Sequence, residues 1–267
     1  GKYVNCYSML PWNNMLHYRD AATGQYVDVK ADPGTPAFRE MWGPFLHAFT
    51  AHLRGKGWLE ITNIAMDERS PEVMAEATAL LREVAPELGI ALADNHKSFK
   101  QYPYIRDMCA GIFGPIDPAD IADRRARGLT TTYYVCCSSG FPNTYTSSAP
   151  AEAVYLSWYA AAGDYDGFLR WAYNSWPEDP IRDSRFGTWT AGDTYIVYPE
   201  GRSSIRFERL VEGIQDWEKI RQLKAEAAGD GERLQRIETL LEPFRSPIAF
   251  EGWEQALREA RAALDTL

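Results

Sequence analysis

Hydrophobic and polar positions alternate along the chain between two patterns, short apolar runs and longer stretches with a helical period. The short runs are rich in β-branched and aromatic residues and predict strands over residues 2–9, 58–66, 89–95, 130–137, 166–174 and 193–198. Apolar residues spaced three and four apart predict helices over residues 38–53, 73–84, 149–162, 207–217, 232–241 and 254–267. Prolines, asparagines and a DAATG sequence predict a loop and a turn over residues 10–24. Prolines and a charged stretch predict loops and short helices over residues 99–129.

Near-continuous apolar strands that alternate with helices predict an α/β fold, with a parallel sheet and helices outside it. Two architectures fit, a (β/α)8 TIM-type barrel that is incomplete at the N-terminus of this chain and an open doubly wound sheet. The barrel needs two strands more than the six predicted. Both architectures place functional residues at the carboxyl ends of strands. The residues predicted there are Asp67, Glu68, Asp94, Asn95, Asn174 and Trp176.

Composition narrows the possible functions. With 267 residues, 45% of them hydrophobic, the chain is long enough to bury a large core, and its net charge of -9 argues against nucleic-acid binding. Aromatic residues make up 13%, which suits stacking against sugar rings, although core packing explains them equally well. The four cysteines and four histidines form no CxxC or HExxH motif, so neither a metal nor another cofactor is expected. No apolar run is long enough to predict a membrane span.

The chemistry that the sequence offers is that of carboxylates. Motifs for dinucleotide binding, phosphoryl transfer and serine hydrolysis are missing from the sequence, whereas Asp67 and Glu68 stand together at a predicted strand end. Adjacent carboxylates do not easily reach opposite sides of a glycosidic bond. They suit substrate-assisted hydrolysis, in which the 2-acetamido group of the sugar is the nucleophile. The same dipeptide before a helix is also typical of a cap and a partner for the helix dipole.

Three stretches of the sequence, MDERSPE, TTYYVCCSSGFPNTYTSSAPAEAVYLSWYAAAGDYDGFLRWAYNSW and DSRFGTWTAGDTYIVYPEGRSSIRFERLVEGIQDWEKI, cover most of residues 58–220. Together they resemble the catalytic domain of glycoside hydrolase family 123, the β-N-acetylgalactosaminidase family. The resemblance implies a (β/α)8 barrel preceded by a β-sandwich domain. Residues 1–267 are then one catalytic barrel domain with C-terminal helices, taken from a longer chain. A fold completed by another copy is the alternative.

The resemblance also implies roles for the adjacent pair. Asp67 is expected to orient and polarise the 2-acetamido group, and Glu68 to act first as general acid and then as general base. For that role Glu68 needs a raised pKa, which a poorly solvated site and the charge of Asp67 would provide. A secreted or periplasmic location is also favoured by the resemblance.

Further residues are expected to contact the sugar: Asn95, Tyr134, Arg170, Trp171, Asn174 and Trp176. The two tryptophans are candidates for a stacking platform, with core packing as the alternative. Arg170 and Asn174 share a face of their strand at period two and are expected to point into the barrel mouth. Asn95 and Tyr134 have either a sugar-binding or a structural role. The helix residues Arg206, Glu208, Arg209 and Asp216 are predicted to form an ion-pair network.

The sequence thus predicts a retaining, exo-acting hydrolase of terminal β-linked N-acetylgalactosamine, with a glycan or glycoconjugate as substrate. One alternative is a conventional retaining glycosidase in which Glu68 works with another carboxylate such as Asp94. The other is a non-catalytic barrel that binds carbohydrate through its aromatic residues.

Overall fold

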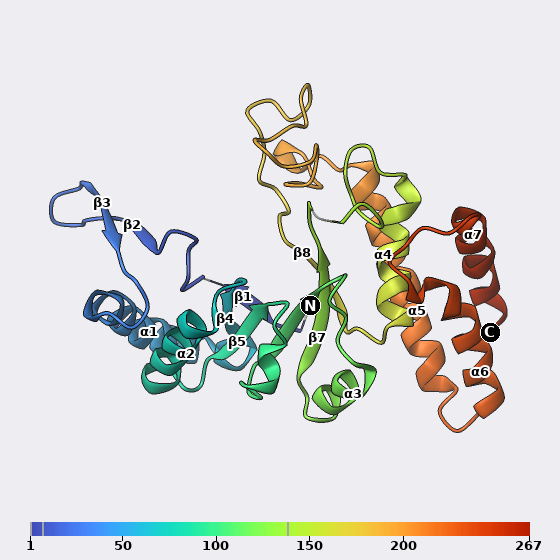
Figure 1. Ribbon diagram of the computed structural model, residues 1–267, viewed down its shortest axis with the longest axis horizontal. Helices are drawn as coiled ribbons and strands as arrows, with labels where there is room; N and C mark the ends of the chain where they lie inside the picture. Colours follow the sequence, from blue (N-terminus) through green and yellow to red (C-terminus); the bar gives the residue numbers. More distant parts are fainter. Residues whose placement is uncertain (1, 7, 138) are drawn as a thin grey trace. The chain divides into compact units, whose positions relative to one another are not determined.

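The computed structural model describes residues 2–6, 8–137 and 139–267, which form two compact units. The first unit comprises residues 1–109 and 128–130, and the second comprises residues 110–127 and 131–267. Within the described residues, one sheet has six strands in the order β1-β4-β5-β6-β7-β8 (Figure 1). Strand β6 (Asp107–Gly111) begins in the first unit and ends in the second.

The first unit is built on parallel strands with helices beside them. Its strands β1 (Val4–Cys6), β4 (Thr62–Met66) and β5 (Gly89–Ala93) pair in register, and the first residues of β6 pair with β5. Ile64 and Ile90 are fully buried, which explains why β4 and β5 read as continuous apolar runs. A two-stranded antiparallel hairpin, β2 (Met15–Arg19) with β3 (Tyr26–Lys30), follows β1 in the sequence and precedes the first helix.

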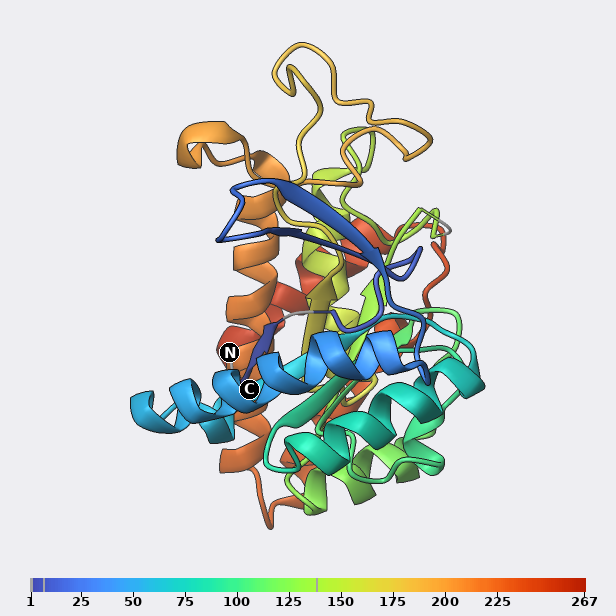
Figure 2. The same cartoon turned by 90° about the vertical axis from the view of Figure 1, so that its left-hand side faces the viewer.

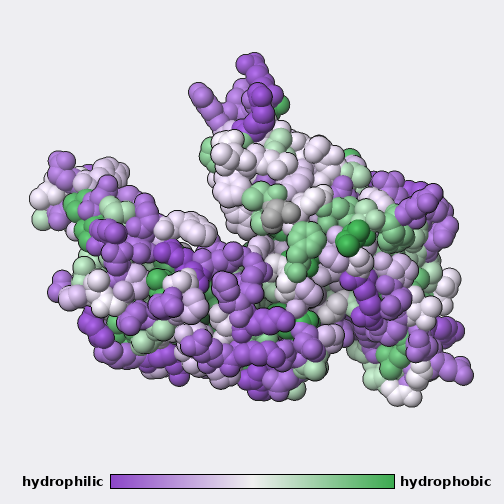
Figure 3. All heavy atoms as spheres, viewed as in Figure 1, coloured by the Kyte–Doolittle hydropathy of each residue, from purple (hydrophilic) through white to green (hydrophobic). Residues whose placement is uncertain are grey.

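Two helices of the first unit pack against each other, α1 (Pro36–Lys56) and α2 (Pro71–Val84) (Figure 2). Both begin at a residue whose hydroxyl accepts a backbone N–H, Thr35 for α1 and Ser70 for α2, followed by a proline. Helix α1 ends at Gly57, whose φ of 72° is the left-handed conformation that glycine adopts without strain. Hydrophilic surface predominates over α1 and α2 in Figure 3, as expected for the outer faces of amphipathic helices.

The second unit contains β7 (Thr130–Val135) except its first residue, Thr130, and all of β8 (Gly167–Arg170). These two strands pair in parallel, and five helices lie among the described residues of the unit. The helices are α3 (Pro118–Ala126), α4 (Pro150–Ala162), α5 (Ile205–Glu226), α6 (Gly231–Leu241) and α7 (Trp253–Ala263). Helix α4 is buried almost throughout and makes its main contact with α5. The two approach closely at Gly213, where a Cβ would lie 2.8 Å from Ser157 Oγ.

The structure confirms the α/β class with parallel strands and most predicted elements. A closed barrel of eight strands stays a prediction, as does the assignment of residues 1–267 to one barrel domain. In the predicted strand 2–9 only Val4–Cys6 is a strand, and Tyr7 lies outside the described residues.

Three predictions of local structure were wrong. Residues 193–198 form no strand but a turn-rich segment with two isolated bridges, from Tyr195 to Asn174 and from Tyr198 to Arg202. Tyr195 and Ile196 are buried, so a buried loop gave the same apolar pattern as a strand. Strand β6 was expected as loop or short helix because the segment 99–129 carries three prolines and a charged stretch, which hid its five strand residues. The carboxylate of Asp107, at the start of β6, accepts a hydrogen bond from the Asn5 amide at 2.9 Å. Strand β2 lies within residues 10–24, which were expected to form a loop and a turn, and no element was predicted for β3; both strands are largely exposed and show no apolar run.

Candidate active site

The carboxylate pair lies where the sequence predicted it, at the carboxyl end of β4. Strand β4 ends at Met66, and Asp67, Glu68 and Arg69 form the bend that leads into α2. The backbone N–H of Glu68 donates to Asp67 Oδ1 at 2.8 Å, so the first carboxylate stabilises the turn that presents the second. Both side chains are half-buried. Ser70 then caps α2, which fixes where the bend stops and the helix starts.

Asn95 meets Glu68 across the ends of two neighbouring strands. Asn95 follows β5, the strand that pairs with β4, and its Nδ2 donates to Glu68 Oε1 at 2.7 Å. Because parallel strands deliver their carboxyl ends to the same edge, this contact is the geometry that the sequence pattern indicated. Asn95 thus joins Asp67 and Glu68 in one group of polar side chains within the first unit.

Asp94 lies beside this group but has a structural task. It is only 3% exposed, and its two oxygens accept the backbone N–H groups of His96 at 2.8 Å and Ser98 at 2.9 Å. These bonds order the turn after β5 and so hold Asn95 in place. With both oxygens facing its own loop, Asp94 is poorly placed to serve as a nucleophile.

The surroundings of Glu68 raise its pKa above the usual range of a carboxyl group. Burial is the largest cause, followed by the negative charges of Asp67 and Asp94, while His96 opposes the change. A carboxyl group with a raised pKa keeps its proton at a higher pH than an ordinary glutamate. It is therefore suited to donate that proton to a leaving group.

The other expected sugar contacts lie in the second unit, Tyr134 within β7 and the rest at the carboxyl end of β8 and beyond. Arg170 is buried and forms an ion pair with Asp193 at 3.2 Å, and Trp171 Nε1 donates to the same carboxylate at 3.1 Å. Burial lowers the pKa of Arg170, and the charge of Asp193 partly offsets this. Asp193, which sequence reasoning had not singled out as a site residue, thus anchors both side chains.

Two tryptophans of this unit keep part of their rings exposed. Trp171 and Trp176 are each 36% exposed; Trp171 lies 4.9 Å from the ring of Trp189, and Trp176 Nε1 donates to Val197 O at 2.8 Å. Anchored and partly exposed indoles can present a face to a sugar. Strand β8 ends at Arg170, so the expectation that Arg170 and Asn174 share a face of one strand was wrong, and Asn174 instead forms an isolated bridge to Tyr195. Tyr134 is 8% exposed within β7, which favours a structural role for it.

The predicted ion-pair network on α5 is only partly present. Arg209 pairs with Glu212 at 2.8 Å, and Asp216 pairs with Arg261 at 2.7 Å. Glu208 instead accepts a hydrogen bond from the Ser203 hydroxyl. The prediction was wrong for Arg206, whose buried guanidinium donates to three backbone carbonyls, those of Thr144, Gly192 and Tyr195.

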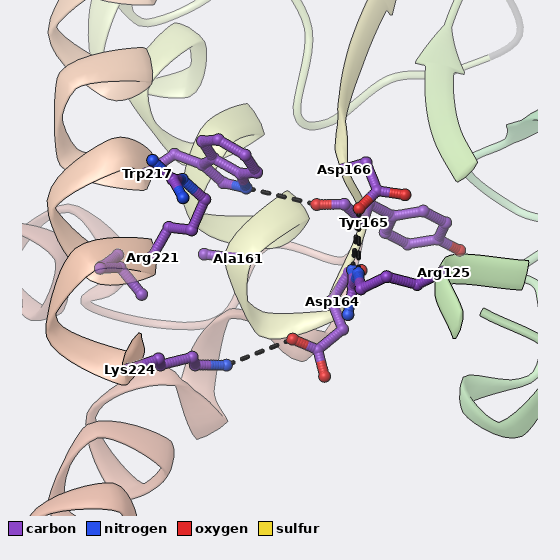
Figure 4. A pocket seen from close by; sticks show the side chains of 9 residues that line it. Arg125, Ala161, Asp164, Tyr165, Asp166, Trp217, Arg221 and Lys224 are labelled. Atoms are coloured by element: carbon purple, nitrogen blue, oxygen red, sulfur yellow. Dashed lines mark hydrogen bonds and ion pairs between the residues drawn. The ribbon is translucent and has the colours of Figure 1, made fainter. Parts of the chain in front are cut away.

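A cavity of about 430 Å³ opens at the amino end of β8, between that strand and α5 (Figure 4). Its charged walls are paired: Arg125 with Asp166 at 3.0 Å and Lys224 with Asp164 at 3.3 Å. The candidate residues after β8 leave from the opposite end of the strand. This cavity is therefore not where they would bind a sugar.

Within the described ranges, no group of three or more His, Cys, Asp or Glu side chains is arranged to hold a metal ion. Nor does any helix of those ranges have the length and apolarity needed to cross a membrane.

Comparison with known proteins identifies the family of the chain. A family model described as "Glycoside hydrolase 123, catalytic domain" matches residues 1–223. A solved structure of a family 123 glycoside hydrolase from Clostridium perfringens, analysed for the details of glycolipid glycan hydrolysis, is similar over 99% of this chain, with a TM-score of 0.82 and 28% identity. The chain covers 50% of that solved protein. No curated protein matched. The chain belongs to glycoside hydrolase family 123.

Proposed function

We propose that the protein is a retaining glycosidase that removes terminal β-linked N-acetylgalactosamine, with the 2-acetamido group of the substrate as nucleophile. The observation that carries the proposal is the position of Glu68, which is half-buried beside Asp67 and bonded to Asn95, and whose pKa is raised. Membership of family 123 supports hydrolysis of a glycoside. The relative from Clostridium perfringens, studied for glycolipid glycan hydrolysis, suggests a glycoconjugate as the substrate class.

In the first step Glu68 gives its proton to the glycosidic oxygen, and the bond from that oxygen to the anomeric carbon breaks. The acetamido carbonyl oxygen forms a bond to the same carbon, which gives a cyclic oxazolinium intermediate. Asp67 accepts a hydrogen bond from the acetamido N–H and stabilises the positive charge that develops on this group. Because Asn95 donates to Oε1 of Glu68, we place the transferable proton on Oε2.

In the second step the Glu68 carboxylate takes a proton from water, and the water oxygen attacks the anomeric carbon. The bond to the acetamido oxygen breaks, so the sugar leaves with the configuration that it had in the substrate. Glu68 ends protonated and ready for the next turnover. Asn95 keeps the carboxyl group oriented through both steps.

A protein nucleophile is the competing mechanism, with Asp94 as its candidate. Its two bonds to backbone N–H groups and its 3% exposure count against it. The third reading, a carbohydrate-binding barrel without catalysis, gives no reason for the raised pKa of Glu68.

The test compares hydrolysis of an aryl β-N-acetylgalactosaminide and the matching aryl β-galactoside by the protein and by Asp67→Asn and Glu68→Gln. Glu72→Gln is the matched control, because Glu72 is an exposed glutamate in the first turn of α2. We expect cleavage of the acetamido sugar alone, lost at least about a hundredfold in the two site variants and kept in the control. Equal cleavage of both sugars would favour a protein nucleophile. Binding of the sugar without cleavage by the unaltered protein would favour the binding barrel.

A further inference from the structure

Trp12 is the tryptophan of the first unit that stands out most from the protein surface. It is 73% exposed, compared with 52% for Trp58 in the same unit. Its chain neighbours Met9 and Leu10 are each 1% exposed, so the loop that carries it is anchored in the core on one side and presents the indole on the other. Leaving a large apolar ring in water forgoes the free energy of burying it. An anchored loop that nevertheless exposes this ring is typical of a contact surface.

Arg69 holds the loop of Trp12 in a defined shape. Its Nη1 donates to the carbonyl oxygens of Leu10 at 3.0 Å and Pro11 at 2.8 Å, and its Nη2 donates to Asn14 Oδ1 at 2.9 Å. The guanidinium lies 5.6 Å from the centre of the Trp12 ring, in a cation–π contact. These contacts place the ring without covering it.

Further bonds stiffen the same turn. The backbone N–H of Asn14 donates to Pro11 O at 2.8 Å, and Asn14 Nδ2 donates to Asp32 Oδ1 at 2.7 Å. A rigid aromatic side chain loses little conformational entropy when a ligand stacks on it. Trp12 is therefore prepared for contact before any ligand arrives.

The loop of Trp12 lies at the edge where the catalytic pair lies. Strand β1 runs parallel to β4, so the chain leaves β1 at the same edge of the sheet at which β4 delivers Asp67 and Glu68. Arg69 follows Glu68 directly and touches the loop. One residue, Arg69, thus connects Glu68 to the loop that carries the exposed indole.

We propose that Trp12 is a stacking platform for the sugar unit of the leaving group, the unit to which the terminal N-acetylgalactosamine is attached. This rests on the proposed function, in which Glu68 protonates the oxygen shared with the leaving group while Asp67 faces the acetamido group of the departing sugar. We therefore assign the region next to Glu68 that holds Arg69 and the Trp12 loop to the leaving group. Pyranose rings offer a flat C–H face that an indole binds well. Arg69 is a positioning residue for this platform.

The experiment measures kcat/KM for two substrates, an aryl β-N-acetylgalactosaminide and a disaccharide in which N-acetylgalactosamine is β-linked to galactose. For Trp12→Ala we expect the ratio of the disaccharide value to the aryl value to fall about tenfold, mainly through KM of the disaccharide. Trp12→Phe should restore part of the ratio because it keeps an aromatic face. Trp58→Ala is the matched control: Trp58 is also exposed but precedes β4, at the other end of the strand, and the ratio should not change.

Two results for Trp12→Ala would overturn the platform. One is an unchanged ratio of the two kcat/KM values together with unchanged values. The other is an equal loss of kcat/KM for both substrates, which would point to an effect through Glu68. Failure of the proposed function is a different result, because the unaltered protein would then cleave neither substrate. In that event the platform is tested by comparing the affinity of the disaccharide for the unaltered protein with its affinity for Trp12→Ala. Weaker binding by the variant supports the platform, and equal binding contradicts it.

Discussion

The Asn95 side-chain amide donates a hydrogen bond of 2.7 Å to Glu68 Oε1. This bond joins the ends of β5 and β4, and it favours the charged form of Glu68, in opposition to burial and to the charges of Asp67 and Asp94, which raise the pKa. Loss of the amide should therefore move the pKa of Glu68 further up. The contact also fixes which oxygen of the carboxyl group is left for proton transfer.

Asn95→Ala should shift the basic limb of the pH–rate profile to higher pH. The general acid works only while protonated, so the rate falls as pH rises through the pKa of Glu68, and a higher pKa delays that fall. We also expect kcat to fall about tenfold, because the carboxyl group loses its orientation. The measurement is kcat/KM against pH for both proteins. A basic limb that moves to lower pH would show that the amide does not act on Glu68.

Glu68→Gln should make the folded protein more stable at pH 7 than the unaltered protein. Because the pKa of Glu68 is raised in the folded state, the folded state holds its proton more tightly. Stability contributed by this group is present below its unfolded-state pKa and is lost as pH rises through the folded-state pKa. The glutamine does not ionise and avoids that loss. Water screens the half-exposed carboxylate, so the gain should stay below about 1 kcal/mol.

Thermal unfolding at pH 7 and near pH 4 measures this difference. The advantage of Glu68→Gln should shrink at the acidic pH, where Glu68 is largely protonated in both states. Glu72→Gln should show no such gain, because hydrogen bonds lower the pKa of Glu72 in the folded state. An advantage of Glu68→Gln that grows towards acidic pH would contradict the raised pKa.

The part of the first unit around β4 and β5 could be predicted from the sequence because these two strands are buried on both faces. Strands β4 and β5 follow apolar runs, and knowing where they end placed Asp67, Glu68 and Asn95 together. Strand β6 and the segment 193–198 show where this reasoning fails. An apolar run reports burial, and burial occurs in loops such as the one around Tyr195 as well as in strands.

Arg69 and Trp12 could not be assigned in the same way. Nothing local in the sequence says that an arginine at the start of a helix will bond the carbonyls of a loop about 58 residues earlier. Such contacts depend on which strands are neighbours in the sheet, and β1 and β4 are neighbours although α1 and the hairpin lie between them in the chain. Likewise, Asp193 anchors Arg170 and Trp171 across a loop whose path no periodic pattern predicts.

Gly213→Ala should destabilise the second unit. A Cβ at this position would lie 2.8 Å from Ser157 Oγ and 3.0 Å from the backbone of Val154, so α4 and α5 would have to move apart. Overpacking of this kind costs about 1–3 kcal/mol. Gly43→Ala in α1 is the matched control, because a Cβ there meets nothing within 4 Å and alanine favours the helix, so stability should rise by up to about 1 kcal/mol. Denaturant unfolding of the two variants measures both effects, and equal changes in both would refute the close packing at Gly213.

Ser70→Ala should cost about 1 kcal/mol of stability through the lost cap of α2. Because Ser70 ends the bend that carries Asp67 and Glu68, we also expect a lower kcat. Thr35→Ala removes the equivalent cap of α1 and should cost similar stability with little change in kcat. Unfolding curves and initial rates compare the two variants, and equal rates would mean that the cap does not hold the bend in place.

The most direct test of the central claim is a series of aryl β-N-acetylgalactosaminides in which fluorine replaces hydrogen on the acetyl group. Fluorine withdraws electrons from the carbonyl oxygen, so if that oxygen is the nucleophile, kcat/KM must fall with each added fluorine. We predict this fall for the unaltered protein. Rates that do not depend on the number of fluorines would contradict substrate-assisted catalysis and would assign the nucleophile to the protein.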